Sequence, residues 1–380
     1  MKAGWETKSL GEIIQLEYGK PLDASQRKSD GLYPVYGANG EKDRSDAYFC
    51  DKPSIIVGRK GSAGEVNLTE SRFWPLDVTY FVTFDEAQFD LQFLYHLLVH
   101  LELPKLAKGV KPGINRNEVY AMGVATPRLA EQKRIVAILD EAFAGIASIR
   151  ATAEQNRQNA RALFETHLQS VSIQQGEGWL EKPLSDLCDI KHGFAFKSEF
   201  FTDDGSYILL TPGNFYESGG YRDRGKKQKY YCGDVPSGFI LEKNDLLVAM
   251  TEQAAGLLGS PILVPDSDRF LHNQRLGLVT PKTGVPWLNE FFFHVFNTQA
   301  VRKEIHDSAS GVKVRHTSPT KIGQVVVAFP ASIDEQRSIV SKLEELQDET
   351  QNLESLYLRK LNVLDELKQS LLHQAFSGQL

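Results

Sequence analysis

Two long stretches of the sequence carry apolar residues at alternating spacings of four and three positions. They cover residues 130–171 and 334–376, contain no proline, and include one glycine, Gly145. This spacing places the apolar residues on one face of a helix and is typical of helices that pack in pairs. The residues predicted to pack between the two helices are Ile135, Leu139, Ile146, Ile149, Leu163, Ile339, Leu343, Leu346, Leu353, Leu364 and Leu371.

The rest of the chain follows a different pattern. It holds short apolar runs, such as Ser54–Val57 and Asp245–Val248, between turns rich in glycine and proline. Such runs are typical of strands in mixed α/β globules. We therefore predict a mixed α/β (α+β) protein of four segments, with a globule at residues 1–129, a helical region at 130–171, a globule at 172–333 and a helical region at 334–380.

The chain is internally repeated, which indicates a duplicated architecture. Trp5 recurs as Trp179 at an offset of 174, and the pair Glu131-Gln132 recurs at an offset of 204 as Glu335-Gln336. The second copy therefore carries insertions in its middle part, and residues 172–178 have the composition of a linker. The two helices are predicted to pack antiparallel about a pseudo-twofold axis, as a rod of about 60 Å at roughly 1.5 Å per residue.

Charge is distributed unevenly over these segments. The formal net charge is −6, and residues 334–380 hold 5 basic and 9 acidic groups, so most of the excess acidity belongs to the last helix. Each globule is nearly neutral and can carry a local basic surface. The sequence has no apolar run of 18 residues and no signal peptide at its start, so we expect a soluble, cytoplasmic protein without a membrane segment.

Several catalytic motifs are missing from the sequence. It has no phosphate-binding Gly-Lys-Ser/Thr loop, no His-Glu-x-x-His, no Cys-x-x-Cys and no Asn/Asp-Pro-Pro-aromatic stretch of an amino-methyltransferase. Their absence lowers the expectation of an enzyme, so we predict neither a catalytic nor a metal site.

Basic loops in the globules are the main candidate chemistry. Gly58–Gly64 sets two cations between glycines, Gly109–Arg116 is a second basic turn, and Tyr221–Tyr231 mixes five cations with aromatics. Such loops suit phosphates and groove edges, although Gly58–Gly64 also fits a plain hairpin and Tyr221–Tyr231 a solvated loop. Cations predicted to contact phosphates are Lys60, Lys111, Lys226, Lys227 and Lys313, and candidates for base edges are Arg59, Asn214, Asn273, Gln274 and Arg275. Further DNA-binding candidates are Tyr36, Asn39, Ser62, Lys108, Asn115, Arg222, Arg224 and Lys229.

Taken together, the repeat and its motifs resemble the specificity (S) subunits of type I restriction-modification systems, the HsdS family. The resemblance covers the whole chain, and its most specific element is a proline followed by Glu-Gln and a long helix, present twice. The stretches that carry it are Tyr33–Gly40, Gly58–Gly64, Pro127–Ile135, Thr211–Phe215 and Asn273–Arg275.

The resemblance implies a subunit without catalysis of its own. Each globule would be a target-recognition domain that reads one half of a bipartite site in double-stranded DNA, and the helices would set the spacer. The implied partners are two methyltransferase (M) subunits, with restriction (R) subunits possible. S-adenosylmethionine, ATP and Mg are then expected on those partners, with no cofactor on this chain.

Three other interpretations remain open from the sequence. A homodimeric two-domain DNA-binding protein would show the same heptads, and a scaffold without DNA contact would tolerate loss of the loop cations. An enzyme acting on nucleic acid should turn over substrate unaided. Sedimentation with and without methyltransferase subunits, DNA binding by loop variants and an activity assay separate these possibilities.

Overall fold

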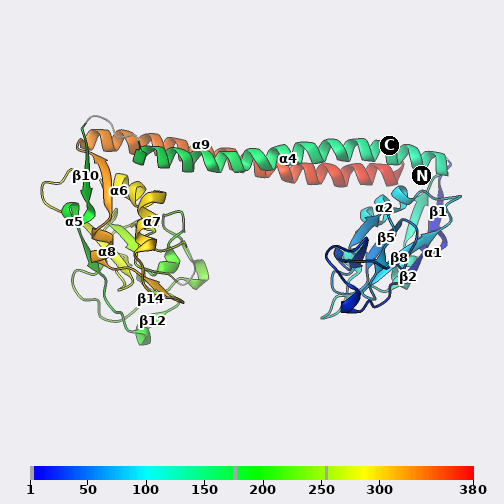
Figure 1. Ribbon diagram of the computed structural model, residues 1–380, viewed down its shortest axis with the longest axis horizontal. Coiled ribbons are helices and arrows are strands. Elements are labelled where there is room, and N and C mark those ends of the chain that lie inside the picture. The colour runs from blue at the N-terminus through cyan, green and yellow to red at the C-terminus, as the bar shows by residue number, and fades with distance from the viewer. Residues whose placement is uncertain (1–3, 174–177, 253–255) are drawn as a thin grey trace. The chain divides into compact units, whose positions relative to one another are not determined.

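The computed structural model describes residues 4–173, 178–252 and 256–380 (Figure 1). These residues form two compact units, with unit 1 comprising Met1–Asn156 and Tyr357–Leu380 and unit 2 comprising Arg157–Leu356. Two long helices, α4 (Leu129–Ile173) and α9 (Ile333–Ser377), each contribute residues to both units. The prediction of two long helices is confirmed, while residues 174–177 of the predicted linker lie outside the described residues.

Unit 1 is built on a four-stranded antiparallel sheet in the order β2-β8-β5-β6. A three-stranded sheet β4-β3-β7 and a pair β1-β9 complete it. The strands are β1 (Glu6–Ser9), β2 (Ile14–Tyr18), β3 (Tyr33–Gly37), β4 (Gly40–Ser45), β5 (Ser54–Gly58), β6 (Val66–Thr69), β7 (Trp74–Pro75), β8 (Thr79–Phe84) and β9 (Gly123–Thr126). The short helices are α1 (Leu10–Ile13), α2 (Leu91–His100) and α3 (Arg116–Tyr120), with 3-10 turns η1 (Ala24–Gln26) and η2 (Leu103–Leu106).

Unit 2 repeats this plan and adds to it. Its four-stranded sheet β11-β20-β16-β18 and its pair β10-β22 match β2-β8-β5-β6 and β1-β9, and a five-stranded sheet β12-β14-β13-β19-β15 and a ribbon β17-β21 join them. The strands are β10 (Trp179–Pro183), β11 (Cys188–His192), β12 (Phe201–Thr202), β13 (Tyr207–Leu209), β14 (Tyr230–Tyr231), β15 (Ile240–Leu241), β16 (Leu246–Ala249), β17 (Thr251–Glu252), β18 (Pro261–Leu263), β19 (Phe270–Leu271), β20 (Leu276–Pro281), β21 (Arg315–His316) and β22 (Val326–Pro330). The helices are α5 (Leu184–Leu187), α6 (Asn289–Phe296), α7 (Gln299–Asp307) and α8 (Pro319–Gly323), with 3-10 turns η3 (Ser198–Phe200), η4 (Pro212–Asn214) and η5 (Gly225–Lys227).

In each unit the globule shares a hydrophobic core with a long helix, through α2 in unit 1 and through α6 in unit 2. In unit 1, Phe93 of α2 meets Phe376 of α9 edge to face at 5.3 Å, and Ile135 and Leu139 of α4 are fully buried with them. In unit 2, α6 buries Phe291 and Phe292 against the start of α9. Burying each such side chain stabilises the fold by about 1.5–3 kcal/mol, which fixes the globular part of each unit on the helices.

Polar contacts join α4 to α9 within each unit. In unit 1, Arg134 donates to the backbone oxygen of Leu380 at 2.8 Å, and Arg150 pairs with Asp365 at 2.5 Å. In unit 2, Arg161 pairs with Glu354 at 2.7 Å. In unit 1 the partner on α9 moves back from Leu380 to Asp365 as the residue on α4 advances from Arg134 to Arg150, so the two helices run antiparallel there, as the sequence predicts.

Most of the predicted packing residues are buried or half-buried, but three are not. Ile149 is 44% exposed, Leu163 is 52% exposed and Leu353 is 39% exposed. The prediction that they pack between the helices is wrong, because the buried positions there recur every seven residues, at Ile146, Ala153 and Ala160 on α4 and at Leu343 and Thr350 on α9. Each of the three exposed residues lies three positions beyond one of these and falls outside the buried face. The remaining predicted residues, Ile135, Leu139, Ile146, Ile339, Leu343, Leu346, Leu364 and Leu371, face the interior.

A buried glutamine ties each long helix to its globule. Gln132 is fully buried near the start of α4; its side-chain oxygen accepts a hydrogen bond from the Asp90 N–H at 2.9 Å, and its amide donates to the Gln88 and Pro127 oxygens. Asp90 is also the N-cap of α2. The repeated Glu-Gln motif therefore joins two helix starts, because it satisfies backbone groups that neither helix can satisfy itself.

Candidate nucleic-acid interface

The two basic turns predicted in the first globule lie side by side in unit 1. Gly61 N–H donates to the Pro112 backbone oxygen at 2.9 Å, and Ile114 N–H donates to the Arg59 backbone oxygen at 3.2 Å. Lys60 and Gly113 form an isolated antiparallel β-bridge. These backbone bonds fix the 58–64 loop against the 108–116 loop. The structure therefore brings Arg59, Lys60, Ser62, Lys108, Lys111 and Asn115 into one region.

Glycines make this close approach possible. A Cβ on Gly58 would lie 2.1 Å from the Ser62 oxygen and 2.7 Å from the Ala38 oxygen, so only glycine fits where the loop turns back beside the Tyr36–Asn39 turn. Gly64 has a φ of +86°, and a Cβ added to it would collide with the backbone of Pro104. Tyr36, half-buried, and Asn39, exposed, consequently lie next to the loop that carries Arg59 and Lys60.

Tyr18 is the central aromatic of this region, and sequence reasoning missed it. It ends β2, is 47% exposed, and lies under two guanidinium groups, those of Arg59 and Arg116, each 5.2 Å from the ring centroid. Tyr80 packs on it at 5.1 Å, and burial is the main cause that raises the pKa of Tyr80. Cations above an exposed ring offer both charge and a stacking plane to a nucleotide.

We call Tyr18, Arg59, Lys60, Lys111 and Arg116 the first loop surface. Lys60 and Lys111 are exposed and suited to phosphates, while Arg59 is half-buried with its Nε unpaired. Two other candidates have structural partners: Lys108 forms an ion pair with Glu118 at 2.8 Å, and the Asn115 side chain accepts from Asn117 N–H as the N-cap of α3.

In unit 2 the same backbone positions carry different side chains. In unit 1, Arg59 N–H donates to the Val78 backbone oxygen, and in unit 2 Met250 N–H donates to the Arg275 backbone oxygen. The backbone oxygen of Arg59 accepts from Ile114 N–H, just as that of Met250 accepts from Thr317 N–H. Gly19 N–H to Thr79 likewise recurs as Gly193 N–H to Leu276. By this correspondence His192 takes the place of Tyr18, and Met250 that of Arg59.

The exposed residues at these places in unit 2 are Gln274, Arg275 and Lys313, which with His192 we call the second loop surface. The backbone oxygen of Gln274 lies 3.4 Å from His192 Nδ1, so these two residues are neighbours. The side-chain oxygen of Asn273 accepts from Arg275 N–H at 3.0 Å. Asn273 itself is 9% exposed, so the structure contradicts its prediction as a base-reading residue and gives it the role of shaping this turn.

The structure also contradicts the prediction that Asn214 reads a base edge. It is fully buried; its oxygen accepts from Thr211 N–H at 3.0 Å, and its amide donates to Gln228 Oε1 at 2.9 Å. The side chain has no free donor aimed at solvent and cannot read a base edge. It instead holds the basic loop that follows it, since its amide also donates to the Arg222 oxygen.

That basic loop borders the five-stranded sheet, whereas the second loop surface borders the four-stranded sheet. Lys226 and Lys227 are exposed on η5, Arg222 lies over the Tyr216 ring at 5.8 Å, and Lys229 lies over the Phe201 ring at 5.2 Å. Arg224 is half-buried against Gly213. The loop offers cations and aromatic planes, and its DNA contact remains a prediction.

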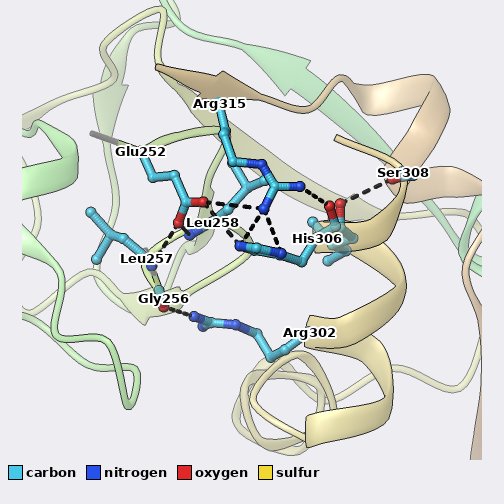
Figure 2. Close-up of polar contacts among 9 residues, drawn as sticks. Glu252, Gly256, Leu257, Leu258, Arg302, His306, Ser308 and Arg315 are labelled. Atoms are coloured by element: carbon cyan, nitrogen blue, oxygen red, sulfur yellow. Dashed lines mark hydrogen bonds and ion pairs between the residues drawn. The ribbon is translucent and has the colours of Figure 1, made fainter. Parts of the chain in front are cut away.

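A buried polar cluster supports the β17-β21 ribbon (Figure 2). Glu252 is 3% exposed; its Oε2 accepts from the N–H groups of Leu257 and Leu258 at 3.0 and 2.9 Å, and its Oε1 lies 3.1 Å from His306 Nε2. Arg315 of β21 contacts the same imidazole and donates to the His306 backbone oxygen. Nearby, burial lowers the pKa of Arg302 to about 10, and Arg302 donates to the Gly256 oxygen.

Over the described residues, no group of three or more His, Cys, Asp or Glu is placed to hold a metal ion. None of the helices in the described part of the chain is long and apolar enough to cross a membrane.

The chain thus has two repeated α/β units, each with exposed lysine or arginine side chains on loops beside its four-stranded sheet. A family model described as the type I restriction modification DNA specificity domain matches residues 2–156 and 176–361. The chain belongs to this family.

Individual relatives agree with the family. The chain is similar to the specificity subunit of the type I restriction enzyme EcoBI from Escherichia coli, at 25% identity over 227 residues, which cover 59% of this chain and 42% of that protein. The chain spans less than half the length of the curated E. coli relatives it matches.

Two solved structures have the same fold. One, from a study of complex assembly and conformational transition of the type I R-M system, covers 100% of this chain and 99% of that chain, with a TM-score of 0.76 and 16% identity. The other, the HsdS subunit from Thermoanaerobacter tengcongensis, covers 100% and 98%, with a TM-score of 0.62 and 16% identity. At this identity the likeness shows the fold.

Proposed function

We propose that this chain is the DNA-recognition (specificity) subunit of a type I restriction-modification enzyme, in which each unit reads one half of a bipartite site in double-stranded DNA. The observation that carries the proposal is the pair of loop surfaces, which share one backbone framework but differ in side chains. Tyr18 and Arg59 in one unit correspond to His192 and Met250 in the other. Such a pair suits two unlike half-sites, since base edges are read by side chains.

Within each surface the cations and the polar side chains have separate tasks. Lys60, Lys111 and Lys313 are exposed and position the phosphates, while Arg59, Gln274 and Arg275 are aimed at base edges. Because the net charge of the chain is −6, the isolated subunit binds DNA weakly and partner subunits add affinity.

The outer faces of the long helices supply the proposed docking sites for two methyltransferase subunits. Ile149 and Leu353 are related by the repeat offset of 204, as are Leu163 and Leu367, and all four are exposed at 39 to 52%. Exposed aliphatic side chains at equivalent places fit two identical partners. In this assembly the methyltransferase subunits bind S-adenosylmethionine, an optional restriction subunit uses ATP and Mg, and the chain acts in the cytoplasm without a cofactor or catalytic group of its own.

Mapping methylated adenines in cells with and without this chain tests the proposal. We expect methylation at one bipartite motif that disappears when the gene is deleted and returns when it is restored. A chain carrying Lys60→Ala and Lys111→Ala should restore methylation poorly, whereas Lys52→Ala, an exposed lysine paired with Glu86, should restore it fully. An unchanged methylation pattern after deletion would refute the function.

A further inference from the structure

The repeat contains a short exposed tip that is the same in both units. Gly109-Val110-Lys111 recurs at an offset of 202 as Gly311-Val312-Lys313. Both glycines have positive φ, +92° and +98°. Val110 is 105% exposed and Val312 is 98% exposed, the largest values among the exposed large hydrophobic residues that the structure describes.

Each tip is held firmly at its base. In unit 1, Lys108 and Gly113 exchange two backbone hydrogen bonds of 3.0 and 3.1 Å, and Gly61 N–H reaches the Pro112 oxygen. The valine therefore projects from a closed loop that is fastened to the first loop surface.

In unit 2 the base of the tip is closed by Ser310 and His316, which exchange bonds of 2.9 and 2.8 Å. The Glu252, His306 and Arg315 cluster then anchors the β21 side of the tip to α7 (Figure 2). Different side chains thus hold the same valine in the same exposed position.

The valine and lysine of the tips are the same in both units, whereas neighbouring positions differ. Residues beside the tips differ between the units, as Lys60 and Thr251 or Asn115 and Ser318 do at matching positions, whereas valine and lysine are shared. Side chains that read bases must differ between unlike half-sites, so shared side chains suit features that every duplex has. A lysine meets a phosphate, and a compact apolar side chain meets sugars and base-pair stacks.

We propose that Val110 and Val312 are apolar wedges, one in each unit, that enter a DNA groove and press on a base step while Lys111 and Lys313 hold the adjacent phosphates. This inference rests on the proposed function and adds a sequence-independent element to each half-site reader. The wedge partly unstacks the step and brings the duplex closer to the polar side chains of its loop surface.

The test uses the full chain with its methyltransferase subunits and a DNA duplex that contains the motif found by methylation mapping. The fluorescent base 2-aminopurine, which reports unstacking, is placed at each base step in turn. Wild-type protein should raise the fluorescence at one step in each half-site. Val110→Thr, which keeps the shape of the side chain but replaces one methyl with a hydroxyl, should abolish the signal in the first half-site and weaken binding about tenfold, because the hydroxyl would be buried without a partner. Val312→Thr should do so in the second half-site, and Val110→Ile should retain both signal and affinity.

The controls separate the wedge from the function on which it rests. Val326→Thr replaces a valine that is 53% exposed on β22 and should leave binding unchanged. If Lys111→Ala and Lys313→Ala weaken binding while both threonine variants behave as wild type, the wedge is refuted and the proposed function stands. If neither lysine nor valine variants change binding, both the wedge and these surfaces as the DNA interface are refuted.

Discussion

The side-chain oxygen of Gln336 accepts a hydrogen bond from the backbone N–H of Leu288 at 2.9 Å. Leu288 precedes α6 as its N-cap residue, and the Gln336 amide also donates to the oxygens of Pro286 and Pro330 at 2.9 and 3.0 Å. The same arrangement surrounds Gln132 in unit 1. A fully buried side chain thus satisfies three backbone groups that have no water to bind.

Replacing this glutamine should destabilise unit 2 strongly. Gln336→Leu leaves one N–H and two carbonyl groups buried without partners, at about 1–3 kcal/mol each. We expect the free energy of unfolding of this unit to fall by about 3 kcal/mol or more, measured by urea denaturation. Gln158→Leu on the exposed face of α4 is the control, and equal midpoints for the two variants would contradict the assignment.

Charges placed on the exposed helix faces should block assembly without unfolding the chain. Ile149→Glu and Leu353→Glu change residues that the chain itself leaves 44% and 39% exposed. We expect an unchanged circular dichroism melt and loss of one methyltransferase subunit from the complex for each substitution, measured by sedimentation. Gln158→Glu should retain both subunits, and full assembly of the two glutamate variants would argue against these docking faces.

Lengthening both helices should change the spacer and leave the bases unchanged. Insertion of seven residues after Asn156 and after Leu356 preserves the helical phase and adds about 10 Å to each helix, equal to about three base pairs. Methylation mapping should show the same two half-sites at a wider separation. Altered half-site bases would contradict a division between loops that read and helices that space.

Acid should destabilise unit 2 through buried histidines. Burial lowers the pKa of His272 and of His294 to about 4, against about 6.5 in an unfolded chain. Between these values the unfolded state binds more protons, so stability is complete above pH 6.5 and falls as the pH drops toward 4, by up to about 1.4 kcal/mol per pH unit for each histidine.

Urea denaturation between pH 7 and pH 4.5 measures this effect. His294→Phe removes one of the two groups and should flatten the pH dependence, while His167→Phe on the exposed side of α4 should not. A His294→Phe protein with the wild-type slope would show that this side chain does not carry the effect.

The helices and the repeat follow from the sequence because they depend on local spacing. Leu139 and Leu343 are buried as the heptads predict. Ile149 and Leu353 are exposed, since a count of apolar positions cannot distinguish a helix face that packs within the chain from one that stays exposed.

The candidate site was only partly predictable for a different reason. Lys60 and Lys111 stand out as charges between glycines, but Tyr18 at the end of β2 meets Arg116 of α3 only in the folded chain, since nearly a hundred positions separate them in the sequence. Asn214 has the residue type of a base reader, yet its place after Pro212-Gly213 closes a turn inward. Whether a side chain faces solvent depends on tertiary packing, which the pattern of residues along the sequence does not contain.

The sharing of α9 between units sets an order for biosynthesis. Leu372, Ala375 and Phe376 complete the core of unit 1, although about 200 residues separate Asn156 from Tyr357. At about 5–20 residues per second, a ribosome needs on the order of 10–40 s to supply them. Throughout that interval the nascent amino-terminal unit exposes an unfinished apolar face, so a stop codon or protease cut near the end of the gene product would damage the first part made.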